Sequence, residues 1–219
     1  GVGATFHMYG GSITGNTVQK GNGGGVFVLC NGAFTMSGGI IGGTGENDAN
    51  QTTYNGGGVY VDATPGDYAS FNMSGTAKIV GNIAEGFGGG VVVCSDYKGV
   101  KSTFTMSDNT VLTGNVAKTR EGGGVYASGA FTMSGNAAVT GNSAAKKEGG
   151  GVYVASDGSF TMSGSAAVTG NNSASSGGGV YVEYYTYKDA AGTFTVSGAA
   201  KVEKNWKNGT LSGDVYEQG

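Results

Sequence analysis

Acidic side chains recur directly after one repeated glycine-rich segment, and they are the first candidates for chemistry. Asp62, Asp96, Asp157 and Glu183 all lie just beyond Gly-Gly-Gly-Val-aromatic-Val or a variant of it. Asp62, Asp96 and Asp157 could bind calcium, because carboxylate oxygens are ligands that Ca²⁺ prefers. Alternatively, two of the acids could form the acid/base pair of a polysaccharide lyase or hydrolase. The simplest interpretation is that they are solvated surface acids, and we expect no catalytic residue.

Tyrosines provide a second candidate site. The middle residue of the Val-aromatic-Val segment is tyrosine in four repeats, at Tyr60, Tyr126, Tyr153 and Tyr181. Alternation along a strand places this residue outside, where an aromatic ring could bind a glycan by stacking on a sugar ring. The favoured alternative is that the stacked tyrosines shield the sheet and stabilise one another.

Hydroxyl groups form a third outward pattern. Thr35 and Ser37 recur as Thr105 and Ser107 and in three later repeats. Strands lie about 4.8 Å apart, and alternate residues about 6.8 Å apart along a strand, so these side chains would form a grid. A grid of this kind could bind ice. This function is the least favoured, because serine lacks the methyl group of threonine.

The two cysteines follow equivalent segments two repeats apart. Two strand steps come to about 9.6 Å, which is beyond the reach of a disulfide. We therefore expect free thiols, with Cys30 pointing inward by strand parity and Cys94 nearer the surface.

Charge and composition exclude several classes of protein. Twelve basic residues against 15 acidic ones give a net charge of −3, so we expect no nucleic-acid partner. Of the 219 residues 47 are glycine, one is proline and three are leucine, which fits neither collagen nor a helical bundle. The apolar runs are too short for a membrane-spanning helix, so we expect no membrane insertion of this segment.

Three phrases recur in a fixed order along the chain. Gly-Gly-Gly-Val-aromatic-Val, or a variant, begins at Gly23, Gly56, Gly88, Gly122, Gly149 and Gly177. Phe-Thr-Met-Ser-Gly, or a variant, begins at Phe6, Phe34, Phe71, Phe104, Phe131, Phe160 and Phe194. The third phrase ends in Gly-Asn or a variant, with asparagine at Asn16, Asn82, Asn115, Asn142, Asn171 and Asn205. Each phrase alternates with period two, which predicts three short strands in each repeat and no helix.

Comparison of the repeats predicts the fold. All six methionines fall in one column, which ends at Val196, and seven of the nine phenylalanines fall in another. Columns of like residues indicate stacked repeats, since a single repeat cannot bury its inner face alone. We expect an all-β, right-handed, single-stranded parallel β-helix of six to seven turns. Residues 1–219 would form one domain and a fragment of a longer repeat protein.

The corners of this coil are expected to depend on glycine and asparagine. The glycine triplet predicts a corner that needs positive φ or a close approach of two backbones. Asparagine tolerates the left-handed conformation, and its amide can bond to the amides above and below it.

The phrases Val139–Ala144 and Gly149–Val154 resemble repeats of bacterial polymorphic outer-membrane proteins and related adhesin-type β-helical surface proteins. The resemblance implies a pectate-lyase-like β-helix at the bacterial cell surface or outside the cell. It implies a non-catalytic structural or adhesin segment. A host or environmental glycan or a protein receptor would be its partner, and end-to-end or lateral self-association is possible. The alternative is a carbohydrate-active module.

Overall fold

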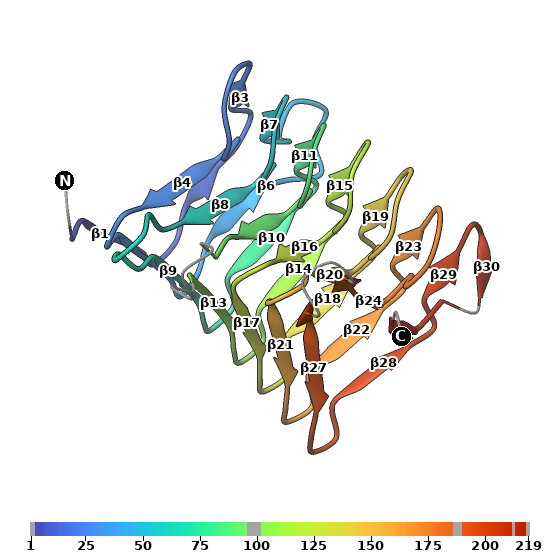
Figure 1. Cartoon of the computed structure of the whole chain (residues 1–219). Helices are drawn as coiled ribbons and strands as arrows, with labels where there is room; N and C mark the ends of the chain where they lie inside the picture. Colours follow the sequence, from blue (N-terminus) through green and yellow to red (C-terminus); the bar gives the residue numbers. More distant parts are fainter. Residues whose placement is uncertain (1–2, 96–101, 186–189, 212, 218–219) are drawn as a thin grey trace.

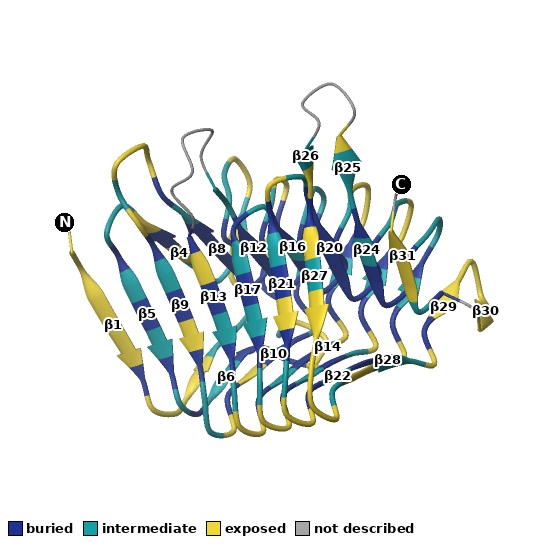
Figure 2. Cartoon of the chain, turned by 60° about the horizontal axis from the view of Figure 1, so that its bottom comes forward, coloured by how far each residue is buried: buried dark blue, intermediate teal, exposed yellow. Residues whose placement is uncertain are grey.

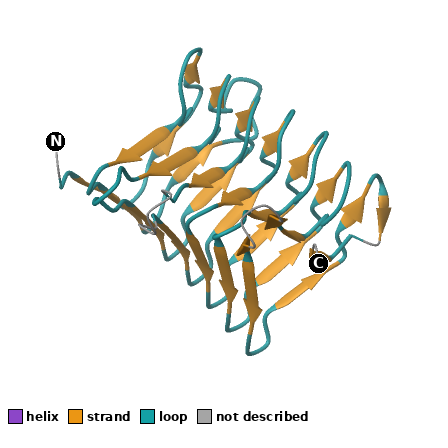
Figure 3. Ribbon diagram, in the orientation of Figure 1, coloured by secondary structure: helices purple, strands orange, loops and turns teal. Residues whose placement is uncertain are grey.

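A computed structural model describes residues 3–95, 102–185, 190–211 and 213–217. These residues form strands and turns and no helix (Figure 3). Four sheets, named A to D here, run along the molecule. The chain passes through A, B, C and D and then returns to A one level further along, so each repeat is one turn of a β-solenoid (Figure 1). Within the described ranges, no helix is long and apolar enough to cross a membrane.

The strands of each sheet come from successive repeats. Sheet A contains β1 (Thr5–Met8), β5 (Ala33–Met36), β9 (Ser70–Met73), β13 (Thr103–Met106), β17 (Ala130–Met133), β21 (Ser159–Met162) and β27 (Thr193–Val196). Sheet B contains β2 (Ser12–Ile13), β6 (Ile40–Gly42), β10 (Lys78–Val80), β14 (Val111–Thr113), β18 (Ala138–Thr140), β22 (Ala167–Thr169) and β28 (Lys201–Glu203). Sheet C contains β3 (Thr17–Val18), β7 (Gln51–Thr52), β11 (Ile83–Ala84), β15 (Val116–Ala117), β19 (Ser143–Ala144), β23 (Asn172–Ser173), β29 (Trp206–Lys207) and β30 (Thr210–Leu211). Sheet D contains β4 (Val26–Leu29), β8 (Val59–Asp62), β12 (Val91–Val93), β16 (Val125–Ala127), β20 (Val152–Val154), β24 (Val180–Val182) and β31 (Val215–Glu217).

Two pairings are antiparallel. Strand β30 folds back on β29 at the last level of sheet C. A separate hairpin of β25 (Tyr184–Tyr185) and β26 (Ala190–Ala191) rises from the sixth turn. The other described strand pairs are parallel and in register, as the columns of like residues predict.

Each turn contains four strands, whereas the phrases predict three. The third phrase divides at its Gly-Asn corner, so that β10 ends at Val80 and β11 begins at Ile83. Strands of sheet C are two residues long in every turn, and a two-residue strand shows no alternation from which it could be recognised.

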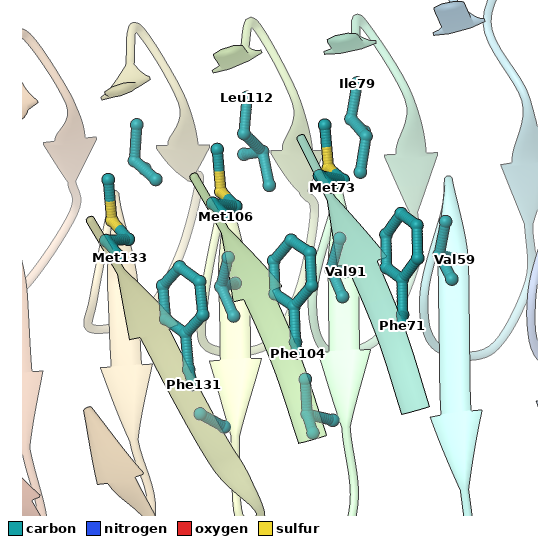
Figure 4. Packing of buried hydrophobic residues seen from close by; sticks show 14 of the residues in the cluster. Val59, Phe71, Met73, Ile79, Val91, Phe104, Met106, Leu112, Phe131 and Met133 are labelled. Carbon is teal, nitrogen blue, oxygen red and sulfur yellow. The ribbon is translucent and has the colours of Figure 1, made fainter. Parts of the chain in front are cut away.

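The interior is built from the predicted columns (Figure 4). Phe71, Phe104 and Phe131 stack with ring centroids 4.9 Å apart and planes within 7° of parallel. Met73, Met106 and Met133 occupy the next inward position on the same strands. These side chains are at most 1% exposed, and full burial of each contributes about 1.5–3 kcal/mol. The inward columns therefore stabilise the stack of turns.

A ladder of asparagines, all of them buried except Asn16, ties the turns together at the corner between sheets B and C. The Oδ1 atom of Asn142 accepts from the backbone N–H of Asn115 at 3.0 Å and from its Nδ2 at 2.9 Å. The same Nδ2 also donates to the carbonyl of Ile79, one turn in the other direction. The ladder consists of Asn16, Asn50, Asn82, Asn115, Asn142, Asn171 and Asn205.

The ladder corrects one expectation about the corner. In every rung except Asn50, the left-handed conformation belongs to the residue before the asparagine, such as Gly81, Gly114 and Gly141, and not to the asparagine itself. This residue is Lys204 in the last turn. Because the preceding residue makes the left-handed turn, the asparagine itself needs no positive φ, and its side chain can bond to both neighbouring turns.

The glycine triplet shows both features that the sequence predicts, a positive φ and a close approach of two backbones. The first glycine of each triplet has a φ between 60° and 74°. A methyl group on the second, such as Gly123, would overlap the backbone of Ser143 and of Gly150 in the next turn. Only glycine fits both positions, and the motif therefore marks a sharp, tightly packed entry into sheet D.

The corner between sheets D and A varies most in length, and we call it the D–A corner. It consists of residues 128–129 in the fourth turn and residues 155–158 in the fifth. It lengthens to residues 63–69 in the second turn, 94–102 in the third and 183–192 in the sixth. Figure 2 shows the β25–β26 hairpin projecting beyond the sheets from this edge. Three of the longer insertions thus lie at the D–A corner, while residues 43–50 form a further one at the corner between sheets B and C.

Candidate functional site

The tyrosine column forms a ladder on the outer face of sheet D. Tyr126 and Tyr153 stack with centroids 5.4 Å apart and planes 5° apart, and Tyr181 continues the stack at 5.0 Å. Val92 interrupts the column, and Tyr60 on its other side meets Phe27 edge-on at 5.3 Å. The geometry matches the interpretation of mutual shielding.

The expectation that this column is an exposed stripe is wrong for two of its members. Tyr60 is 8% exposed and Tyr153 is 7% exposed, while Tyr126 and Tyr181 are half-buried. Strand alternation identifies the side of the sheet but not the neighbours that cover it. A sugar ring has little access to the faces of rings that are already stacked on one another.

Hydrogen bonds and burial fix the phenol groups. The thiol of Cys94 donates to the hydroxyl of Tyr60 at 3.1 Å, and Tyr153 donates to the carboxylate of Glu183. Burial raises the pKa of Tyr60, Tyr126 and Tyr153 well above its ordinary value, and that of Tyr181 to about 12. The nearby carboxylate of Glu183 raises the pKa of Tyr153 further. These phenols therefore stay protonated at neutral pH.

The predicted metal ligands lie on different turns. Asp62 is half-buried at the end of β8, and burial raises the pKa of its carboxyl group. Asp157 is exposed in the fifth turn, on left-handed backbone with a φ of 69°. Asp96 lies outside the described residues. No group of three or more acidic, histidine or cysteine side chains suited to a metal ion occurs among the residues described, and calcium binding remains a prediction.

Two glutamates lie in environments that the sequence does not reveal. Glu183 accepts the backbone N–H of Ser156 at 2.9 Å and thereby links the sixth turn to the corner of the fifth. The Oε2 atom of Glu121 is buried without a hydrogen-bond partner in the described structure. Burial is the main cause that raises the pKa of Glu121, and Glu148 adds to it, against the opposing effects of Lys147 and Arg120.

The cysteines are free, as predicted, but their environments differ from the prediction. Cys30 has a φ of 45°, and this left-handed backbone interrupts the inward/outward alternation of the strand. Its sulfur lies 3.4 Å from the Thr64 hydroxyl in an exposed contact. Cys94 is the more enclosed thiol, and burial raises its pKa to about 11. The register aligns Leu29 with Asp62 and Val93 with Val61. Cys94, which follows Val93, therefore shares a column with Leu29 and Asp62, and Cys30 does not.

The hydroxyl grid is present only in part. Thr105, Thr132 and Thr161 are aligned on the outer face of sheet A. The hydroxyls of Ser107 and Ser197 donate to the carbonyls of Met73 and Met162 in the preceding turn. Ice binding by the Thr/Ser grid remains a prediction.

Exposed tyrosines occur instead on insertions of the D–A corner. Tyr68 is 61% exposed and Tyr185 is 41% exposed. Sequence reasoning missed both because they lie outside the repeated phrases. Their common signal is that each occurs in an insertion between a sheet D strand and the following sheet A strand.

The chain has no detectable match to any protein family, curated protein or solved structure.

Proposed function

We propose that this chain is a non-catalytic, extracellular module of a bacterial surface or secreted protein, a stiff coil that presents recognition loops as an adhesin does. The observation that supports this best is the contrast between the inward columns and the D–A corner. The columns keep the same residue types through successive turns, while the corner changes from residues 128–129 to residues 183–192 between the fourth and sixth turns. Variable loops on a constant frame are typical of recognition surfaces.

We also propose that the coil is right-handed. Parallel strands joined by a crossover favour that hand strongly, and every turn of this chain joins parallel strands.

Bead adhesion tests the proposal. Beads coated with the 219-residue chain should attach to cell monolayers and to immobilised glycoproteins, whereas beads coated with the urea-unfolded, alkylated chain should not. A parallel incubation with neutral and acidic polysaccharides should release no new reducing ends and no unsaturated products. Equal attachment of folded and unfolded chains, or sustained polysaccharide cleavage, would overturn the proposal.

A carbohydrate-binding role is the second candidate, and a specific observation favours it. Tyrosines with exposed rings stand on the same corner as the variable insertions, outside the packed ladder of sheet D.

A further inference from the structure

We propose that Asn208 is a site of spontaneous covalent modification, at which the folded chain converts asparagine to aspartate and isoaspartate through a cyclic imide. The reaction is independent of the proposed function, since it needs neither a receptor nor a glycan. Asparagine is among the less durable residues of proteins, and it is most easily attacked when glycine follows it. The chain has four such pairs, which begin at Asn22, Asn31, Asn55 and Asn208.

The reaction consumes only water. The backbone nitrogen of the glycine attacks the side-chain Cγ of the asparagine, so that a bond forms between these two atoms and the Cγ–Nδ2 bond breaks. The side-chain nitrogen leaves as ammonia and takes the proton that the backbone nitrogen loses. Water then opens the cyclic imide at either of its carbonyls, which gives aspartate or isoaspartate. Glycine permits the attack because it has no Cβ to obstruct it.

Stacking of the turns protects the pairs at Asn22 and Asn55. The N–H of Gly23 donates to the carbonyl of Asn55 at 2.9 Å, and the N–H of Gly56 donates to the carbonyl of Phe87 at 2.9 Å. The side chains are held as well, because Oδ1 of Asn22 accepts the N–H of Asn55 at 3.1 Å. The Oδ1 atom of Asn55 accepts the N–H of Phe87 at 2.9 Å. Neither nitrogen can attack until neighbouring turns separate.

The pair at Asn31 is protected within the D–A corner. The N–H of Gly32 donates to the carbonyl of Leu29 at 3.1 Å. The Oδ1 atom of Asn31 accepts the N–H of Tyr68 at 3.2 Å, and its Nδ2 donates to the carboxylate of Asp67. Both the attacking nitrogen and the amide that would leave are therefore engaged in the folded chain.

The pair at Asn208 lies open. Asn208 and Gly209 form the whole turn between β29 and β30, since Lys207 pairs with Thr210, and their φ values are 47° and 74°. Both residues are exposed, on the hairpin that Figure 2 shows at the last level of sheet C. Within the described ranges, the side-chain amide of Asn208 has no hydrogen-bond partner. The N–H of Gly209 meets Oδ1 of Asn172 in an exposed contact of 3.5 Å, which is long for a hydrogen bond.

The two products change this hairpin in different ways. Aspartate places a negative charge beside Lys207 and keeps the length of the backbone. Isoaspartate adds one carbon to the backbone of a turn whose length fixes the pairing of Trp206 with Leu211. We expect the isoaspartate form to lose this pairing, while the parallel turns keep theirs.

Peptide mapping of the incubated chain tests the proposal. The native chain and a guanidinium-unfolded sample are held at pH 8, cleaved after glutamate in mild acid, and analysed by mass spectrometry that separates aspartate from isoaspartate. Cleavage after Glu203 and Glu217 keeps Asn208 and Gly209 in one peptide. In the unfolded sample all four pairs should react. In the folded chain Asn208 should react about tenfold or more faster than each of the others, because their glycine nitrogens are freed only by local opening.

Asn208→Gln is the matched variant, since it keeps a side-chain amide but moves it one carbon away from the attacking nitrogen. Its folded form, verified by circular dichroism throughout the incubation, should stay unmodified at this position. Modification of the folded native chain spread evenly over the four pairs would overturn the inference. An Asn208 that stays intact in the folded chain, over a period in which all four pairs react in the unfolded sample, would overturn it equally.

Discussion

Asn205 donates its backbone N–H and its side-chain Nδ2 to a single carboxylate oxygen of Asp214, at 2.9 and 3.1 Å. In every earlier rung of the ladder that acceptor is the amide oxygen of another asparagine. An asparagine in place of Asp214 would bring two further N–H donors that need partners, whereas an ionised aspartate only accepts. Aspartate is therefore suited to be the last rung.

The asparagine ladder should be a main source of stability. Asn142→Ala removes the acceptor of the buried backbone N–H of Asn115, while the Nδ2 of Asn115 keeps the carbonyls of Ile79 and Thr113. The unpaired backbone N–H should cost about 1–3 kcal/mol of unfolding free energy, measured by urea denaturation. Asp214→Ala should cost less, because Asp214 is only half-buried and water can reach the freed groups. The reverse order of the two variants would contradict this account.

The second glycine of each triplet should tolerate no side chain. In Gly123→Ala the added methyl overlaps the backbone of the next turn, and we expect a loss of about 1–3 kcal/mol or more, seen as a lower urea midpoint. Gly10→Ala is the control, because a methyl there meets nothing within 4 Å. Equal midpoints for the two variants would show that the turns can separate without cost.

Glu121 should make the fold less stable as the pH rises. Its pKa is raised in the fold by burial, so between its unfolded value of about 4.3 and the higher folded value the unfolded chain binds fewer protons. Unfolding free energy therefore falls with rising pH across that window and then levels off. Glu121→Gln should raise the thermal midpoint at pH 7, and its advantage should shrink towards zero below pH 4. A variant less stable than the native chain at pH 7 would refute the prediction.

The two thiols should differ in reactivity. At pH 8 an aromatic disulfide reagent should modify Cys30 first, because Cys94 is enclosed, bonded to Tyr60 and has a pKa raised to about 11. Cys30→Ser leaves Cys94 as the only thiol and should react slowly when folded and rapidly in guanidinium chloride. Equally fast reaction of Cys94 in the folded and unfolded states would count against its burial.

Much of the fold follows from the sequence because successive turns repeat the same pattern of side chains. The inward columns of phenylalanine, methionine and valine need only period-two alternation and stacking, and the register confirms them. The short strands of sheet C, such as Ile83–Ala84, leave no such signal. Asn50 also escaped the pattern, since no glycine precedes it, yet it joins the ladder through Asn16 and Asn82.

The sequence alone determined that the chain winds as stacked turns. The alternation of side chains and the repeat length are local properties, and they recur in every repeat. Only the tertiary structure decided which outward residues reach water. Tyr153 is covered by its neighbours in adjacent turns, and Tyr68 is exposed because an insertion carries it beyond the sheets. Exposure depends on side chains and corner lengths in other turns, and no local pattern encodes these.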